Sequence, residues 1–323
     1  MTRSRKGVRL MNRSLMHTAA RLHYLEGASQ LEVSRRMQVS TATVSRLLAH
    51  AREQGIVRIH VADLDEADEI GDELCSALKL RAVRVLESGK GAALSSQVNA
   101  LLMEAGLPAG SVIAIGWGRT VQSIIASGLP RIPGSIVVPT TGGMHETASH
   151  FQINEFVRTA AEQMQGEAYF LHAPSLASEE LRSVLSTDPE TARILECWSR
   201  TDAAIVGIGD FQRATTNRGI KFENHEHVVG DVSRHYFDGE GREIRWPGQD
   251  NLMAIGREEL RRTPLSIGVA VGSEKVRAIV GAARSGMINA LVTDALAARL
   301  VLEHLEGRPG SSARLDADMA QKS

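Results

Sequence analysis

Residue types that could hold an anion follow two apolar runs of the sequence. GWGRT, residues 116–120, comes directly after SVIAI and opens a helical pattern, and PTTGG, residues 139–143, comes directly after SIVV. Backbone N–H groups at such turns, together with the dipole of a following helix, favour a bound phosphate or carboxylate. The alternative is that these residues serve only a tight turn or a plain loop. The candidates are Gly116, Gly118, Arg119, Thr120, Thr140, Thr141, Gly142 and Gly143.

Three charged residues further along could complete such a site. Lys275 stands in the first turn of a predicted helix, where the helix dipole disfavours a cation unless an anion is near, so it is a candidate phosphate contact. Asp231 could accept hydrogen bonds from sugar hydroxyls, and Asp210 follows the weak G-x-G pattern of Gly207 and Gly209. A solvated lysine, and a turn or capping role for Asp231, are the alternatives.

The sequence gives little support for a catalytic site, a metal site or a cofactor site. The GWGRT segment lacks the third glycine of a dinucleotide fingerprint and the lysine of a P-loop. His225-Glu226-His227 has no evident third metal ligand, and Ser175 with His172 has no acid placed to complete a nucleophilic triad. We therefore expect no catalytic residue, no metal site and no cofactor.

A helix-turn-helix is predicted between residues 30 and 55, QLEVSRRMQVSTATVSRLLAHAREQG. The turn falls at Gln38 and Val39, and Ser40 or Thr41 can cap the second helix. The spacing predicts apolar faces formed by Leu31, Val33 and Met37 on the first helix and by Val44, Leu47, Leu48 and Ala51 on the second.

The opposite face of the second helix carries hydroxyls and guanidiniums that can bind base edges or phosphates in a major groove. An ordinary helical hairpin is the alternative, and charge decides against it. Residues 1–60 hold eleven Lys/Arg and three Asp/Glu, a net charge of +8, which leaves −9 for the rest of the chain. Such a basic segment is typical of a DNA-binding module. The predicted DNA-binding residues are Arg35, Arg36, Thr41, Thr43, Ser45, Arg46 and Arg52.

Further elements must position these side chains. Residues 12–26 show helical spacing and predict the first helix of a three-helix unit, and IVRIHV, residues 56–61, predicts either a short wing strand or a simple connection. From residue 63 an acidic-headed helical pattern begins. We therefore predict a DNA-binding domain over residues 1–60, an effector domain over 61–308 and a disordered tail over 309–323.

Beyond residue 61, apolar strand-like runs alternate with helical patterns. The runs are RAVRVLES, SVIAIG, SIVVP, EAYFLHAP, AAIVGIG, LSIGVAVG and INALVT. This alternation predicts an α/β fold with a parallel, doubly wound sheet and helices on both faces. Ligands of such sheets bind at the carboxyl ends of the strands.

Composition limits the compartment and the class of protein. No run of about 18 apolar residues indicates a transmembrane helix, and the basic N-terminus lacks the apolar stretch of a secretory signal. Cys75 and Cys197 are far apart and predict neither a disulfide framework nor a zinc site. We expect a cytoplasmic protein without membrane contact.

The order of motifs resembles the SorC family of bacterial sugar-responsive transcription regulators. The resemblance covers nearly the whole chain: the helix-turn-helix, IGWGRT, VVPTTGG, the helix at Asn154, FLHAP, AIVGIGD, VVGDVSRHYFD and GVAVGSEKVRAIVGAARSGMINALVTDALAARLVL. It implies a Rossmann-like effector domain, similar to phosphosugar isomerases, that binds a phosphorylated sugar. It also implies oligomers, dimers or tetramers, on operator DNA.

Carried over by position, the resemblance places the ligand near Gly116, Gly118, Arg119, Thr120, Thr140–Gly143, Asp231 and Lys275. Tyr169 and Phe170 stand where some relatives carry a basic residue for a second phosphate, which argues against a bisphosphate ligand. The segment between Asp210 and Asp231 is expected to cover the site.

The sequence therefore predicts a transcription factor whose operator affinity depends on a phosphosugar or related carbohydrate, and not an enzyme. Two other functions stay open. One is an active phosphosugar isomerase or deaminase with a DNA-binding head, which would need a general base such as Asp210 or Asp231. The other is an architectural DNA-binding protein with a purely structural body.

Overall fold

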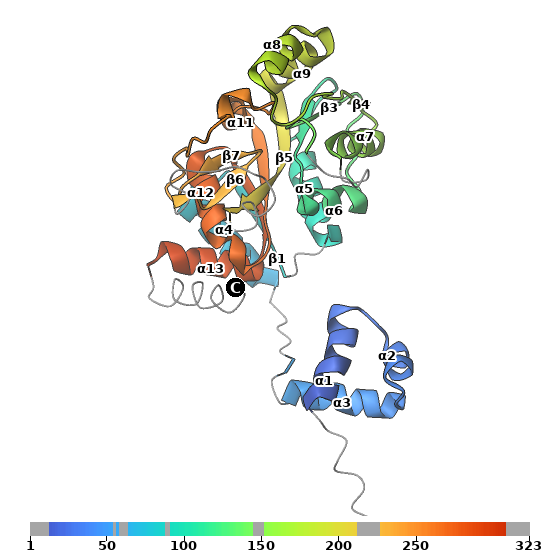
Figure 1. The fold of residues 1–323 in the computed structure, drawn as a ribbon. Coiled ribbons are helices and arrows are strands. Elements are labelled where there is room, and N and C mark those ends of the chain that lie inside the picture. Colours follow the sequence, from blue (N-terminus) through green and yellow to red (C-terminus); the bar gives the residue numbers. More distant parts are fainter. Residues whose placement is uncertain are drawn as a thin grey trace, which may run out of the picture. The chain divides into compact units, whose positions relative to one another are not determined.

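The computed structural model describes residues 13–53, 56–57, 64–87, 91–144, 152–211 and 227–307 (Figure 1). The chain divides into two compact units, residues 1–62 and residues 63–323. Each unit has its own hydrophobic core.

The first unit contains three helices where the sequence predicts them. They are α1 (Arg13–Ala20), which continues as one π-helical turn, η1 (Arg21–Leu25), then α2 (Gln30–Met37) and α3 (Thr41–Glu53). Ser29 and Glu32 form a reciprocal capping box at the start of α2, which satisfies two backbone N–H groups that the helix leaves open. Gln38 ends α2 in the left-handed conformation at φ +54° and so makes the predicted turn.

The core of this unit confirms one predicted apolar face and corrects the other. Val44, Leu47, Leu48 and Ala51 of α3 are all buried. On α2, however, Leu31 is 52% exposed, whereas Val33 and Ser34 are buried. Leu31 and Val33 are about 200° apart around a helix of 3.6 residues per turn, so both cannot face one core. The possible wing lies largely outside the described residues, which include only 56–57 of that segment.

The second unit is built on the predicted parallel sheet, in which every neighbouring pair along the main order is parallel. Val, Ile and Ala fill its central strands, as expected for strands buried on both faces. The strand order is β1 (Ala82–Leu86), β9 (Ala290–Asp294), β8 (Leu265–Val269), β5 (Thr201–Asp210), β2 (Val112–Ile115), β3 (Ile136–Pro139), β4 (Glu167–Ala168).

Helices cover both faces of the sheet (Figure 1). Alternate sheet residues divide between two cores: Ala114 and Val206 belong to one, and Ile113 and Ile205 to the other. The first core is completed by α4 (Leu64–Leu78), α9 (Pro189–Ser199), α12 (Val276–Ser285) and α13 (Ala295–Leu305). The second is completed by α5 (Gly91–Glu104), α6 (Arg119–Ser127) and α7 (Ile153–Met164).

The chain order reverses between β2 and β5. From β2 the chain continues to β3 and then β4 on one side, whereas from β5 it continues to β8 and then β9 on the other. The connections therefore diverge at the carboxyl ends of β2 and β5, which is where open α/β sheets bind their ligands.

Two elements differ from the sequence prediction. The predicted strand over residues 167–174 is reduced to β4. The chain leaves the sheet edge after Tyr169, whose N–H donates to Val137 O, and pairs again at an isolated bridge from Pro174 to Gly143. An antiparallel hairpin that the sequence analysis did not predict, β6 (Gly230–Val232) and β7 (His235–Phe237), extends from the carboxyl end of β5. The other helices described are α8 (Glu179–Thr187) and α11 (Arg257–Arg262), with 3-10 turns η4 (Gln249–Asn251) and η5 (Ser273–Lys275).

In the part of the chain that the structure describes, no helix has the length and apolar character needed to span a membrane.

Candidate functional site

Gly116 directly follows β2, at the point where the chain order reverses. Its N–H donates to the carbonyl of Ile205 at 2.8 Å. A Cβ at this position would lie 2.9 Å from that carbonyl oxygen and 3.0 Å from the Cα of Val206, so only glycine lets β2 and β5 continue this close together. Gly116 therefore has a clear packing role at the edge where a ligand is expected.

Gly118, in contrast, has nothing within 4 Å of a Cβ position and adopts φ +141°. It precedes α6, whose first residue is Arg119. The side chain of Arg119 is exposed and that of Thr120 is half-buried. The turn thus leaves open space beside the N-terminus of a nine-residue helix, where the positive end of the helix dipole and a guanidinium favour an anion.

The loop after β3 is tied down by backbone pairing on both sides. Gly142 donates to Met253 O at 2.8 Å, and Gly143 donates to Ala173 O at 2.8 Å. A Cβ on Gly142 would lie 2.5 Å from Ala173 O, so this glycine is required by packing. Thr140 and Thr141 are buried, and the Thr141 hydroxyl donates to Met253 O at 3.4 Å. These residues line the carboxyl edge of the sheet, but their contacts serve packing as well.

Asp231 lies at the same edge, on the hairpin strand β6. It is paired with Gly209, and its Oδ1 lies 1.9 Å from where a Gly209 Cβ would be. Gly209 therefore makes room for this carboxylate, and Asp210, half-buried, is the next residue of β5. The G-x-G pattern ahead of Asp210 thus has a physical reason: its second glycine accommodates Asp231.

Lys275 approaches this edge from the loop that follows β8. Its Nζ donates to the carbonyl of Ile208 at 2.8 Å, two residues before Asp210. The structure therefore brings Asp210, Asp231 and Lys275 to the end of β5, beside the strand β2 that carries the Gly116 turn. Their role toward a ligand stays a prediction.

Three polar residues at this edge were not identified as ligand-site candidates from the sequence. Ser233 and Arg234 form the turn of the β6–β7 hairpin, and Ser233 Oγ donates to Thr140 Oγ1 at 3.1 Å. Arg234 is buried, and its Nη1 donates to the Ser175 hydroxyl at 2.6 Å. Ser-Arg is not a hairpin turn signal, since such turns favour Asn-Gly or Asp-Gly, so the sequence pattern held no clue to this cluster.

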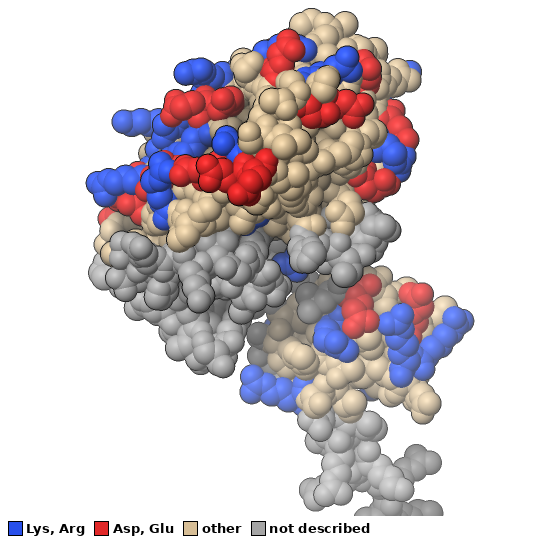
Figure 2. Space-filling view, turned by 45° about the horizontal axis from the view of Figure 1, so that its top comes forward, with Lys and Arg blue, Asp and Glu red and all other residues tan. Residues whose placement is uncertain are grey.

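On the first unit, the predicted DNA-facing residues lie on the surface. Arg35, Arg36, Thr41, Ser45, Arg46 and Arg52 are exposed, and Thr43 is half-buried. Figure 2 shows blue Lys and Arg side chains standing out on this unit. Two of the predicted residues are engaged locally: Thr43 Oγ1 is 2.8 Å from the hydroxyl of Ser40, the residue that caps α3, and Arg36 pairs with Glu26 at 3.1 Å.

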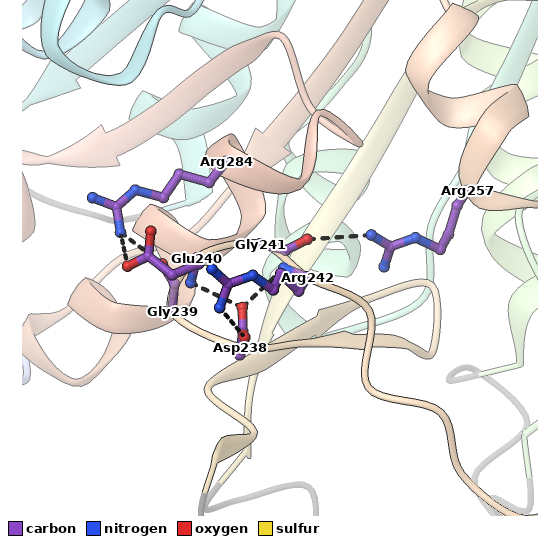
Figure 3. A network of polar contacts seen from close by, with 7 residues as sticks. All are labelled: Asp238, Gly239, Glu240, Gly241, Arg242, Arg257 and Arg284. Atoms are coloured by element: carbon purple, nitrogen blue, oxygen red, sulfur yellow. Dashed lines mark hydrogen bonds and ion pairs between the residues drawn. The ribbon is translucent and has the colours of Figure 1, made fainter.

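A cavity of about 510 Å³ occurs elsewhere on the second unit, outside the predicted ligand residues. Figure 3 shows the turn beside it, in which Arg257 Nη2 donates to Gly241 O at 3.3 Å and Arg284 Nη1 to Gly239 O at 2.9 Å. Burial lowers the pKa of Arg257. Three arginines and three glutamates line the cavity, so it offers no excess positive charge for a phosphate. The lining residues are His235, Gly241, Arg242, Glu243, Arg257, Glu258, Glu259 and Arg261.

Among the described residues, no group of three or more His, Cys, Asp or Glu side chains is arranged to hold a metal ion. His225 and Glu226 lie outside these residues. Ser175 has Arg234 as its hydrogen-bond partner, as described above, and His172 is exposed.

Comparison with known proteins agrees with this architecture. Residues 63–303 match the family model Sugar-bind, "Putative sugar-binding domain". The chain is 30% identical over 304 residues to the sorbitol operon regulator of Klebsiella pneumoniae, covering 88% of this chain and 96% of the relative. It is 27% identical over 302 residues to the deoxyribonucleoside regulator of Bacillus subtilis, covering 89% and 96%.

The crystal structure of the full-length sorbitol operon regulator SorC from Klebsiella pneumoniae superposes with a TM-score of 0.66 at 29% identity, covering 90% of this chain and 98% of that chain. The matches thus extend over both units. The chain belongs to the SorC family of sugar-responsive transcriptional regulators.

Proposed function

We propose that the second unit binds a phosphorylated sugar at the carboxyl ends of β2, β3, β5 and β8, and that this ligand sets the affinity of the first unit for operator DNA. The observation that carries the proposal is that a positive and a negative side chain meet at the end of β5. The ammonium of Lys275 and the carboxylate of Asp231 are both fixed there, beside the strand that leads into α6.

Each part of such a ligand has a suitable partner at this edge. A phosphate would receive N–H groups from the start of α6, where Gly118 leaves open space, and charge from Arg119 and Lys275. Sugar hydroxyls would donate to Asp231 and to Asp210. The buried Thr140 and the loop to Gly143 would form the floor of the site.

On the DNA side, we propose that α3 enters the major groove. Its buried face is apolar and holds it against α1 and α2, and its outer face presents Thr41, Ser45 and Arg46. Arginines on α2 and at the end of α3 would contact phosphates, which fixes register without reading sequence. One unit of this size binds weakly, so we propose that the chain acts as a homo-oligomer, a dimer or tetramer, whose paired units contact two half-sites.

A thermal-shift screen tests the ligand proposal. The panel holds D-glucitol 6-phosphate, D-glucose 6-phosphate, D-ribose 5-phosphate, the 2-deoxy forms of the last two, and the unphosphorylated parents. A ligand at 100 times its dissociation constant should add about 2.7 kcal/mol to the free energy of unfolding. A selective shift by sugar phosphates supports the proposal. A flat result with all members would reject a phosphosugar sensor and favour a purely structural body.

A second measurement separates the two units. Arg46→Ala should weaken operator binding and keep the ligand-induced shift, because Arg46 is exposed on α3 and belongs to the other compact unit. Unchanged operator affinity would show that α3 is not the reading helix.

We further propose that the ligand is bound and not converted. The relatives named above are regulators, which supports a binding role for this site. Incubation of each sugar phosphate with the protein, followed by chromatography of the products, tests this. Isomerised or deaminated product formed in proportion to protein concentration, and abolished by Asp231→Ala, would establish an enzyme instead.

A further inference from the structure

The turn of the β6–β7 hairpin has an unusual backbone. Val232 pairs with His235, and the two residues between them, Ser233 and Arg234, adopt φ of +48° and +67°. Two consecutive left-handed residues make the turn that suits a two-residue hairpin, but the conformation favours glycine and asparagine. Here neither position is glycine or asparagine. Strain of this kind persists when the surroundings hold it in place, and it clusters at functional sites.

The two turn residues are held by three segments that lie outside the hairpin. The guanidinium donates to the Ser175 hydroxyl at 2.6 Å and lies over the indole of Trp246, 5.4 Å from the ring centroid. Its neighbour Ser233 donates to Thr140. Arg234 is 7% exposed, so its charge has been removed from water at a position where a smaller residue would have served the turn better.

The same residue fixes Asp231. The backbone N–H of Arg234 donates to Asp231 Oδ2 at 3.0 Å, while the other carboxylate oxygen lies over Gly209. The direction of the carboxylate at the end of β5 therefore depends on the left-handed turn, and the turn is held by the buried guanidinium.

We infer that Arg234 is a positioning residue that sets the orientation of the Asp231 carboxylate and thereby the selectivity of the strand-end site for a sugar hydroxyl. This inference rests on the proposed function, because it takes Asp231 as a ligand contact. Arg234 acts through Asp231 and is not itself assigned a contact with the ligand.

Arg234→Gly is the informative variant. Glycine can adopt the left-handed turn, so the variant can fold, but glycine also adopts other conformations. Without the guanidinium, nothing holds the turn, and the N–H that donates to Asp231, in one conformation. We expect the variant to fold, and its affinity for the tightest sugar phosphate of the panel to fall about tenfold, the effect of weakening one hydrogen bond to a charged group. We also expect it to bind D-ribose 5-phosphate and 2-deoxy-D-ribose 5-phosphate, or the corresponding glucose pair, with nearly equal affinity. If the guanidinium does not set the orientation of Asp231, the ratio of the two affinities stays as in the wild type.

The matched control is Lys79→Gly. Lys79 is another basic residue in the left-handed region, at φ +54°, but it is exposed and precedes the amino end of β1, at the opposite edge of the sheet. This variant should keep both affinity and selectivity. Ser175→Ala provides a second route, since it removes the acceptor of the guanidinium and leaves the turn residues intact. If Arg234→Gly does not fold, Ser175→Ala must show the loss of selectivity for the inference to stand.

A double-mutant cycle with Asp231→Ala completes the test. If Arg234 acts through Asp231, adding Arg234→Gly to Asp231→Ala costs no further affinity, so the two effects are not additive. Additive losses, or wild-type selectivity in Arg234→Gly, overturn the inference. Wild-type affinity in Asp231→Ala would instead reject the proposed site itself, and the inference with it.

Discussion

Lys275 is the residue on which the phosphate part of the proposed site most depends. Its ammonium is held by Ile208 O at the end of β5, so it is fixed before any ligand arrives. Lys275→Met keeps the length of the side chain and removes the charge. Hydrogen bonds to charged groups contribute about 1.5–3 kcal/mol, so sugar phosphates should bind roughly 10- to 100-fold more weakly to this variant.

The unphosphorylated parent sugars provide the internal control for Lys275→Met, because their affinity should not change. Isothermal titration calorimetry of both ligand forms measures the difference. Lys79→Met serves as the control for loss of a lysine charge elsewhere, since Lys79 is exposed. Equal weakening of both ligand forms by Lys275→Met would mean that Lys275 supports the fold of the edge and does not contact phosphate.

His235 makes stability depend on pH in a definite direction. Burial lowers the pKa of His235, against the opposing effect of its ring nitrogen bonding to Ile255 O. The unfolded chain therefore takes up a proton below pH about 6.5, while the native state does so only at lower pH. The free energy of unfolding should fall between pH 7.5 and 5.5, by at most about 1.4 kcal/mol per pH unit from this group.

His235→Gln should flatten that slope, because the glutamine amide can donate to Ile255 O and does not titrate. The variant should retain a smaller slope from His304, whose pKa is also lowered, by burial and by Arg277 and Arg284. Urea unfolding at several pH values measures the effect. A slope identical to that of the wild type in His235→Gln would contradict the assignment.

Helix α3 is the element whose packing makes DNA reading possible, and its core is small. Leu47 is 2% exposed in the core of the first unit, and a core leucine replaced by alanine typically costs about 2–5 kcal/mol. A unit of this size has little stability to lose. Leu47→Ala should therefore abolish operator binding at 37 °C but preserve the ligand-induced shift of the second unit, measured in the same preparation.

Leu31→Ala is the matched control, the same substitution on α2 at a side chain that is 52% exposed. It should change stability by no more than about 0.5 kcal/mol. Circular dichroism shows whether each variant is folded. If Leu31→Ala stays folded but no longer binds the operator, the exposed leucine contributes to the operator contact.

Among the helices and strands, the sequence pattern predicted those that depend on local periodicity. The apolar runs at 112–115 and 201–210 are strands, and the helix predicted from Arg119 begins there. What could not be predicted depends on distant contacts. The hairpin at Ser233 and Arg234 carries no turn signal, because Arg234 is held in its left-handed conformation by Ser175 and Trp246, which lie outside the hairpin.

The candidate site likewise has a part that the sequence could predict and a part that depends on contacts between distant segments. Because carboxyl ends of parallel strands share one edge, the sequence could place Lys275, Asp210 and Gly116 together. It could not show that Gly142 is required by Ala173 O or that Gly209 makes room for Asp231, since these are backbone approaches between segments with no common pattern.

For the whole molecule, function requires that two compact units with separate cores respond to each other. A ligand changes operator affinity only if it binds one arrangement of the chain, or of its oligomer, more tightly than another. The following relation holds whether the ligand raises or lowers operator affinity. Whatever factor the sugar phosphate applies to operator affinity, the operator must apply to sugar phosphate affinity.

This reciprocity gives a prediction for the intact protein. If the sugar phosphate changes the operator dissociation constant by a given factor, commonly about 5- to 150-fold, then saturating operator should change the sugar phosphate dissociation constant by the same factor. Fluorescence anisotropy of labelled operator and calorimetry of the sugar phosphate, at one salt concentration, measure the two. A scrambled duplex of equal length controls for sequence-independent phosphate binding, which is strongly salt-dependent. Lys275→Met should reduce both factors together, because it weakens the ligand contact that drives the coupling. Unequal factors in the wild type would mean that the ligand detected by thermal shift binds a site other than the one that controls DNA binding.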